Sequence, residues 1–357
     1  MKRLQELDFL RGIAIGLVLL RHQQLIRFTT NMGWIGVDLF FVLSGFLVSG
    51  LLFGEFNKYG TISPGRFLVR RGFKIYPIYY LFYIPYLVLF LLKGFEIEWG
   101  RMAADFTFTQ NYFWGWGYAY PASWSLAVEE HFYFGLAFVL FLLIKYRLFT
   151  PETVRSVKVE ISIASLLIVC LLLRLVSNSL SPLDIARNFS MTHLRIDSLL
   201  VGVLISYLFH FKRSVLDSFV IKHGYKILVL ILALVSWTPF IDPTNSIFIR
   251  TFGFVFTYLA FGLVLIVFLV KADIKEVVQK FITRPVFSMI SKVGYCSYSI
   301  YVIHTLVNYL FEGSGLNHAL RFFSAIGLSV GLGMLMTYWV EAYFLRLRDR
   351  IVPSRVV

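Results

Sequence analysis

The sequence predicts an all-α fold, a polytopic membrane helix bundle of about ten transmembrane helices with both termini in the cytoplasm. Only 15% of its 357 residues are charged and 58% are hydrophobic, whereas soluble domains carry about 25% charged residues. Apolar runs of roughly 20 residues, the length that spans a bilayer, recur along the chain, so we expect one transmembrane domain over residues 1–357. The predicted spans are 8–26, 34–53, 75–92, 124–144, 159–177, 192–210, 225–241, 249–270, 295–311 and 322–342.

The distribution of basic residues gives these spans an orientation. If both termini lie inside, the inner segments hold 24 of the 34 lysines and arginines, and the outer segments hold six. Cytoplasmic loops of membrane proteins carry such an excess. The same distribution explains most of the net charge of +14, so we expect membrane lipids as partners and no nucleic acid.

The first span, 8–26, contains charge that hydrocarbon disfavours. Asp8 and Arg11 stand near its inner end, and His22 stands near its outer end. Arg11 and His22 are eleven residues apart, so they lie about 20° apart on one helix face. Along the axis they are separated by roughly 16 Å, at 1.5 Å per residue. Because charged groups inside a bilayer need partners or a wet cavity, this face indicates a cavity with two polar ends.

Other spans add polar side chains at the same two depths. The span 295–311 carries polar residues at helical spacing, and four further spans contribute acids and bases. At the outer level we expect His22, Asp38, Ser125, Glu129, Arg195, Asp197 and His304. At the inner level we expect Asp8, Arg11, Arg71, Lys74 and Glu341. The sequence therefore predicts an internal cavity with a basic inner mouth and a mixed outer chamber of acids, bases and imidazoles.

Each of these groups also has a purely structural interpretation. A lone intramembrane histidine is usually a satisfied structural group, Arg71 and Lys74 fit a topology signal, and Arg195 and Asp197 can neutralise each other. The aromatic run that ends at Trp124 is typical of an interfacial belt. What favours a site is that residues from four spans share one depth, namely His22, Asp38, Glu129 and His304.

Six stretches carry most of these residues, and they occur in a fixed order. They are "LDFLRGIAIGLVLLRH", "GWIGVDLFFVLSGFL", "FLVRRGFKIYPIYY", "SWSLAVEEHFYF", "LRIDSLLVG" and "GYCSYSIYVIHTL". Together they resemble the motifs of the acyltransferase 3 family of integral membrane acyltransferases, and the resemblance covers nearly the whole chain. One such stretch alone would be a weak signal, but six in order are specific.

The resemblance implies transfer of an acyl group, often acetyl, from cytoplasmic acyl-coenzyme A to a hydroxyl of a cell-surface or lipid-linked saccharide. Acyl-coenzyme A is then a donor substrate, and we expect no permanently bound cofactor. The implied location is the bacterial inner membrane. Some members carry a fused esterase-like domain, and we expect none here because the sequence ends 16 residues after Glu341. The acceptor, the acyl chain and the oligomeric state are left open.

By position, the resemblance assigns His22 as the catalytic histidine and places Glu129 at the catalytic level. It assigns donor binding to Arg11, Arg71 and Lys74. The family usually has a second arginine where this chain has Lys74, and a lysine keeps the charge but lacks the planar fork that grips phosphate. The supporting residues are Asp8, Asp38, Trp124, Ser125, Arg195, Asp197 and His304.

The expected chemistry follows from the two polar ends of the cavity. The basic mouth suits the phosphates of the donor, whose arm would rise along the face that joins Arg11 to His22. His22 would take the acceptor proton as general base, and Glu129 would orient its ring. Arg195, or backbone N–H groups near the start of the span 124–144, would stabilise the oxyanion. Direct transfer and an acyl-histidine intermediate both stay open.

Two other classes of function compete with an enzyme. Intramembrane charges also mark the paths of transporters, so a flippase for a lipid-linked glycan is the main alternative, although the paired interrupted segments of many transporters do not occur. An inactive relative that acts as an assembly partner is the other, and the intact Arg11, His22 and Glu129 argue against it. Cys170 and Cys296 fit no metal-site spacing, and we expect no metal.

Overall fold

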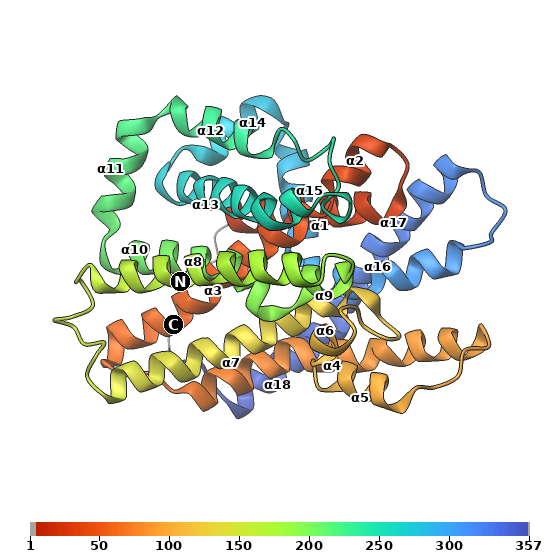
Figure 1. Ribbon diagram of the computed structural model, residues 1–357, viewed down its shortest axis with the longest axis horizontal. Coiled ribbons are helices and arrows are strands. Elements are labelled where there is room, and N and C mark those ends of the chain that lie inside the picture. Colours follow the sequence, from red (N-terminus) through yellow and green to blue (C-terminus); the bar gives the residue numbers. More distant parts are fainter. Residues whose placement is uncertain (1–4, 356–357) are drawn as a thin grey trace.

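The computed structural model describes residues 5–355, and this part of the chain is helical, without a β-strand. The predicted all-α bundle is therefore confirmed (Figure 1). The first half contains α1 (Gln5–Gln23), α2 (Arg27–Met32), α3 (Ile35–Tyr59), α4 (Pro64–Leu92), α5 (Trp99–Phe106), α6 (Gln110–Phe113), α7 (Trp124–Lys145) and α8 (Lys158–Leu180). The second half contains α9 (Ile185–Ser190), α10 (Ile196–Phe211), α11 (Arg213–His223), α12 (Tyr225–Val235), α13 (Phe254–Val270), α14 (Ile274–Phe281), α15 (Arg284–Tyr295), α16 (Ser297–Phe311), α17 (His318–Leu335) and α18 (Ala342–Ile351). Short 3-10 turns cover Pro121–Ser123, Thr192–Leu194 and Pro243–Asn245, and π-helical turns cover Ile249–Gly253 and Met336–Glu341.

Each of the ten predicted spans coincides with a helix, namely α1, α3, α4, α7, α8, α10, α12, α13, α16 and α17. Within residues 5–355, six helical segments are long and apolar enough to cross a membrane, or up to eight if two bent helix pairs each form one span. The bends are 107° between α10 and α11 and 78° between α15 and α16. These segments make the protein a multi-pass membrane protein. The count of ten stays a prediction.

The predicted span 225–241 is shorter than expected. α12 ends at Val235, and its 11 residues are about 16 Å long at 1.5 Å per residue, which is about half of the hydrocarbon thickness. The helix ends because the hydroxyl groups of Ser236 and Thr238 donate back to the carbonyls of Ala233 and Val235, at 3.2 and 2.8 Å. Pro239 follows at once, and proline has no N–H to continue the helix.

Two glycine-lined crossings fix the helices that surround the centre of the bundle. A Cβ on Gly45 of α3 would lie 2.0 Å from the carbonyl oxygen of Leu199 in α10. A Cβ on Gly202 of α10 would lie 2.2 Å from the carbonyl oxygen of Val42 in α3. α3 and α10 therefore pack backbone to backbone, as small residues allow in membranes. A Cβ on Gly294 of α15 would likewise lie 1.8 Å from a carbonyl oxygen of α1.

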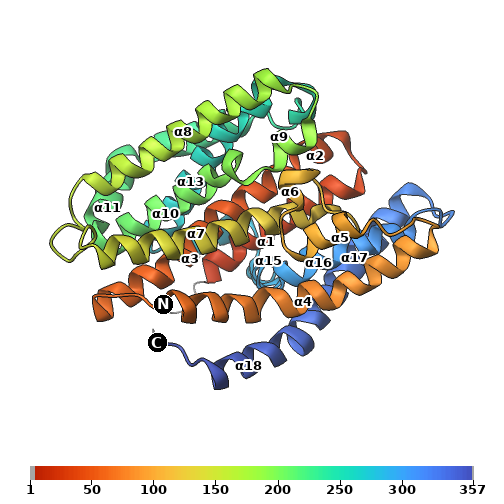
Figure 2. The same ribbon diagram turned by 60° about the horizontal axis from the view of Figure 1, so that its bottom comes forward.

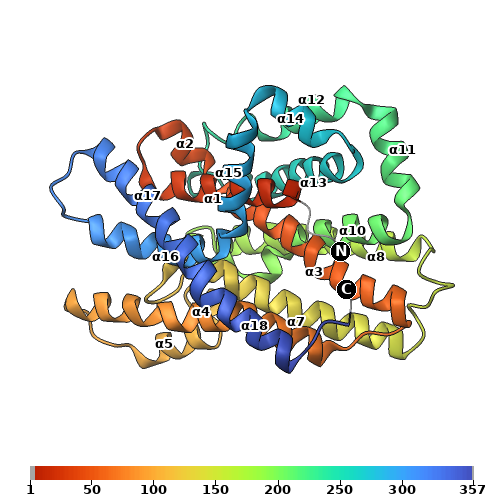
Figure 3. The same cartoon turned by 180° about the vertical axis from the view of Figure 1, so that it is seen from behind.

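The arrangement of the helices places α1, α3 and α7 in the middle of the molecule. Figure 2 shows α8, α10 and α13 on one side of them, and α4, α16 and α18 on the other. Figure 3 shows that α1 begins and α18 ends toward the same end of the bundle. At that end, Lys58 and Tyr59 donate to the carbonyl oxygen of Arg355, at 3.2 and 2.9 Å. Which side of the membrane this end faces stays a prediction.

Candidate active site

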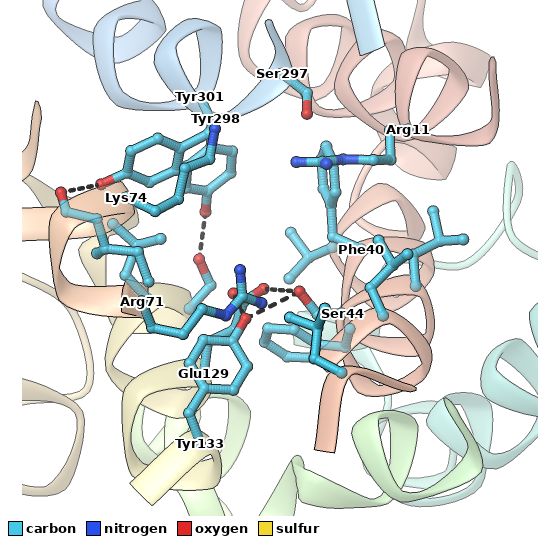
Figure 4. Close-up of a pocket in the computed structure, with 18 residues that line it drawn as sticks. Arg11, Phe40, Ser44, Arg71, Lys74, Glu129, Tyr133, Ser297, Tyr298 and Tyr301 are labelled. Carbon is cyan, nitrogen blue, oxygen red and sulfur yellow. Dashed lines mark hydrogen bonds between the residues drawn. The ribbon is translucent and has the colours of Figure 1, made fainter. Parts of the chain in front are cut away.

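A pocket lies among α1, α3, α4, α7 and α16, and it brings together residues from five of the six sequence motifs (Figure 4). One wall is apolar and is formed by residues of α3 such as Val37, Phe40 and Leu47. The polar lining consists of Arg11 (α1), Ser44 (α3), Arg71 and Lys74 (α4), Ser125, Glu129 and Tyr133 (α7), and Ser297, Tyr298 and Tyr301 (α16).

The three predicted donor-binding cations, Arg11, Arg71 and Lys74, all line this pocket. Lys74 forms an ion pair with Glu341, the acid predicted at the same level. The guanidinium of Arg71 lies 4.7 Å from the centre of the Tyr133 ring. Among the salt bridges of the described residues, none involves Arg11 or Arg71. Within residues 5–355, Arg11 and Arg71 therefore form no ion pair, although Glu129 lines the same pocket, and this excess of positive charge suits an anion.

Glu129 also lies in this pocket, and both of its carboxylate oxygens accept hydrogen bonds. Ser44 donates to one carboxylate oxygen at 3.1 Å, and the hydroxyl of Tyr133 donates to the other. Ser44 and Tyr133 contact each other at 3.0 Å. The expectation that Glu129 orients the ring of His22 is wrong for this structure, because within residues 5–355 no hydrogen bond joins them and Glu129 instead shares a pocket with Arg11.

The depth of α7 explains this difference. The expectation assumed that the helix begins at the membrane surface near Trp124. In the structure, α6 and the 3-10 turn Pro121–Ser123 pack against the start of α7, and Ser123, Trp124 and Val128 are all buried. The helix therefore begins inside the protein, and each of its residues lies deeper than a count from the surface suggests. The same burial shows that Trp124 belongs to the core, where it packs against Phe41 and Phe189, and not to an interfacial belt.

His22 and His304 form a second polar cluster at the C-terminal end of α1. The two rings lie edge to face, with centroids 4.9 Å apart. His22 is exposed, whereas His304 is fully buried. One residue further along α1, the side-chain amide of Gln23 donates to Asn308 of α16. The predicted polar stripe of α16 is thus confirmed, because Ser297 and Tyr301 line the pocket while His304 and Asn308 meet α1.

Asp38, Arg195 and Asp197 form no part of either cluster. Arg195 pairs with Asp38 at 2.6 Å, and Asp197 pairs with Arg174, and all four side chains are fully buried. The guanidinium of Arg195 lies 3.8 Å from the centre of the Phe254 ring. These two ion pairs join α3, α8 and α10, so they act as structural links between helices. The suggestion that Arg195 neutralises Asp197 is wrong, because each has another partner, and no donor of Arg195 faces the pocket.

Two other predicted supporting residues have clear positions. The hydroxyl of Ser125 contacts that of Tyr301 at 2.7 Å, at the side of the pocket formed by α7 and α16. Asp8 is buried at the start of α1, where the Asp8 carbonyl meets Gly294 of α15, and it does not line the pocket.

Sequence reasoning missed Ser44, Tyr133 and Tyr298. Tyr133 stands four residues after Glu129, a spacing that places both on one helix face, so that signal was present in the sequence. Ser44 lies within the second motif and was hidden among apolar residues. Tyr298 donates to the carbonyl oxygen of Ile75 at 2.7 Å and thereby ties α16 to α4 beside the pocket.

Several known proteins resemble this chain. A putative O-acetyltransferase of Staphylococcus aureus is 28% identical over 334 residues, which is 86% of this chain and 51% of that protein. The peptidoglycan O-acetyltransferase OatA of Listeria monocytogenes is 32% identical over 37% of this chain and 23% of its own length. The putative peptidoglycan O-acetyltransferase YrhL of Bacillus subtilis is 32% identical over 36% of this chain and 22% of its own. The chain thus spans about half, or less, of the length of these relatives.

No solved structure matches the chain. The profile of a protein family, described as an acyltransferase domain, matches residues 4–338. That range contains all six motifs, the pocket and the histidine pair. The chain therefore belongs to the acyltransferase 3 family.

Proposed function

We propose that the protein is an integral membrane O-acyltransferase that moves an acyl group, most simply acetyl, from cytoplasmic acyl-coenzyme A to a hydroxyl of a cell-wall saccharide. The observation that carries this proposal is that Arg11 and Arg71, which form no ion pair within residues 5–355, converge in one pocket, and that Arg11 lies on the same helix as His22. The family membership supports the reaction class. The names of the relatives support a saccharide acceptor.

The donor phosphates belong at the basic side of the pocket. Arginine and lysine make charge-assisted hydrogen bonds to phosphate, and arginine makes them with two parallel N–H groups. Arg11 and Arg71 form no ion pair within residues 5–355, so their guanidinium groups are available for such contacts. Lys74 is held by Glu341, so it contributes charge at the mouth and contacts phosphate only by exchanging partners. This arrangement gives the two arginines the larger share of donor affinity.

The apolar wall of the pocket suits the uncharged arm of the donor. Val37, Phe40 and Leu47 of α3 line one side, and Tyr301 of α16 lies on another. From Arg11 to His22 the helix rises roughly 16 Å at 1.5 Å per residue. An extended arm that starts at the arginines therefore points its thioester toward the outer end of α1, where His22 is exposed.

His22 is the group best placed to activate the acceptor. In the proposed step its unprotonated ring nitrogen takes the proton of the acceptor hydroxyl while the oxygen attacks the thioester carbonyl. The tetrahedral intermediate then expels the coenzyme A sulfur, which receives the proton from the imidazolium. An acyl-histidine intermediate would use the same nitrogen as nucleophile. Arg195 takes no part in either route, because it is buried against Asp38.

The acceptor is proposed to approach from outside the cell membrane, because His22 is exposed at the predicted outer end of α1. Sugar hydroxyls of the cell wall lie on that side. A flippase for a lipid-linked glycan is the competing function, since buried charges also line transport paths.

One experiment separates these functions. Cell-surface glycans are analysed by mass spectrometry with and without the gene, and the purified protein is incubated with labelled acetyl-coenzyme A and cell-wall fragments. We expect O-acetyl groups to disappear from the glycan without the gene, and label to transfer in vitro. If the glycan instead accumulates unmodified inside the cell, and no label is transferred, the protein is a transporter.

A further inference from the structure

A buried histidine without a complete set of hydrogen bonds lies beside the proposed catalytic base. The Nδ1 atom of His304 lies 2.5 Å from the carbonyl oxygen of Tyr301. A carbonyl oxygen only accepts hydrogen bonds, so Nδ1 carries the proton, and the Nε2 atom of the neutral ring is left as an acceptor. The hydroxyl of Tyr120 donates to the same carbonyl at 2.7 Å, which fixes that oxygen between two donors.

This acceptor nitrogen has no hydrogen-bond partner in the part of the chain that the structure describes. Nε2 of His304 is buried, and within residues 5–355 no hydrogen bond reaches it. Leaving a buried polar atom unpaired costs about 1–3 kcal/mol, and such atoms are rare enough in native proteins to need an explanation. His304 is fully buried on α16, so bulk water does not supply the missing donor.

The nearest ring that has a donor to offer is that of His22. Its centroid lies 4.9 Å from that of His304, at an interplanar angle of 62°. In the described part of the chain His22 has no hydrogen bond of its own, and Glu129, the group expected to orient it, is held by Ser44 and Tyr133. Next to this pair, Gln23 and Asn308 clamp α1 to α16, so the two rings keep one relative register.

We infer that His304 is the positioning residue of the proposed base, with its Nε2 atom accepting a hydrogen bond from one ring N–H of His22. This inference rests on the proposed function of His22. The two rings are in contact but not yet hydrogen-bonded, and catalytic hydrogen bonds are often long before substrate binds. A rotation of the exposed His22 ring closes the bond, and the other nitrogen of His22 is then unprotonated and turned to the acceptor.

The hydrogen bond has a role at each stage of the reaction. Before transfer it selects the tautomer of His22 that has its free lone pair toward the sugar hydroxyl. When His22 takes the hydroxyl proton, the imidazolium keeps its N–H directed at His304 Nε2, a charge-assisted bond that is stronger than the neutral one. The proton then passes from His22 to the departing sulfur. His304 gains and loses no proton, so it acts as the carboxylate does in a serine-protease triad.

Two substitutions at His304 separate positioning from structure. His304→Gln keeps a side-chain acceptor near the place of Nε2, whereas His304→Leu fills similar space with no acceptor. In purified protein that binds acetyl-coenzyme A normally, we expect His304→Leu to lower kcat about 100-fold, the cost of a misplaced catalytic group. We expect His304→Gln to recover activity to within about tenfold of the parent protein, with KM for the donor unchanged in both variants. The matched control is His210→Leu, since His210 contacts a backbone carbonyl in the same way, at 2.8 Å from Ser206, but its ring packs against Phe53, Phe209 and Phe211 and not against His22; it should keep full activity.

A measurement that does not depend on activity completes the test. The protein has seven histidines, so ¹⁵N-histidine NMR of the membrane-reconstituted protein can be assigned by single substitutions. With coenzyme A bound, we expect an Nδ1–H tautomer at His304, and a His22 signal that changes from one tautomer to a mixture in His304→Leu. An Nε2–H tautomer at His304, an unchanged His22 signal, or equal loss of kcat in His304→Leu and His304→Gln overturns the inference. If the parent protein shows the expected NMR signals but transfers no acyl group, the proposed function fails and the histidine pair stands.

Discussion

At the residue scale, the polar side chains of α1 show how a predicted membrane-spanning helix accommodates charge. Arg11 lines a pocket together with Arg71 and Lys74, and the ring of His22 contacts that of His304. The other arginine of the same helix, Arg21, pairs with Asp242 at 2.5 Å and also donates to the carbonyl of Thr30 at 3.1 Å. The charges of α1 thus fall into two kinds. Arg21 is satisfied by the protein, whereas Arg11 lacks an acidic partner among the described residues and is available to a ligand.

Arg71→Ala tests the donor side at the residue scale. The substitution removes one charge-assisted contact to phosphate, worth about 1.5–3 kcal/mol, so we expect the Kd for coenzyme A to rise about tenfold to a hundredfold. Isothermal titration of the detergent-purified protein measures this. Arg70→Ala is the matched control, because the adjacent Arg70 pairs with Asp349 outside the pocket. Equal Kd values for Arg71→Ala and the parent protein would reduce the basic motif to a topology signal.

At the scale of elements, the buried ion pairs hold the scaffold and leave the chemistry to other residues. Asp38 of α3 accepts from Arg195, which immediately precedes α10, and also from Ser198 and Thr257, at 3.2 and 3.3 Å. Removing one member of a buried pair leaves an uncompensated charge, which costs about 3–5 kcal/mol. We therefore expect Asp38→Ala to lose folded protein, as judged by thermal unfolding in detergent.

The double variant Asp38→Leu with Arg195→Met removes both charges, and we expect it to recover much of that stability. It should also keep measurable acyl transfer, because neither residue lines the pocket. A double variant that is well folded but entirely inactive would mean that Arg195 takes part in the reaction after all.

Helix elements also show what could be read from the sequence and what could not. The positions of α1, α3, α4, α7 and α16 followed from apolar length, and the stripe on α16 followed from the 3.6-residue period. Depth was harder to predict, because Glu129 was counted from a helix start that α6 and the turn Pro121–Ser123 cover. The partner of Asp197 was missed because Arg174 stands alone in an apolar run, where only tertiary structure shows what it meets.

At the scale of the whole molecule, the account depends on which end of the bundle faces the cytoplasm. The basic asymmetry predicts that residues 60–70, 148–156 and 272–284 lie inside, and that residues 95–120 and 312–318 lie outside. Single cysteines introduced in these segments can be labelled from either side, and the two native cysteines are buried and give little background. Labelling of 272–284 from outside would reverse α16 and place the histidine pair on the cytoplasmic side.

His22→Ala tests the central claim most directly, with acyl transfer by the purified protein measured at saturating acetyl-coenzyme A. We expect transfer to fall at least about 100-fold, the lower limit of what a positioned general base contributes. Folding and coenzyme A affinity should be unchanged, because Arg11 and Arg71 bind at the other end of α1. The control is His193→Ala, because the His193 ring stacks on Tyr112 and not on His22 or His304, and it should transfer normally. Near-normal turnover by His22→Ala would contradict the account and make His304 the leading candidate for the base.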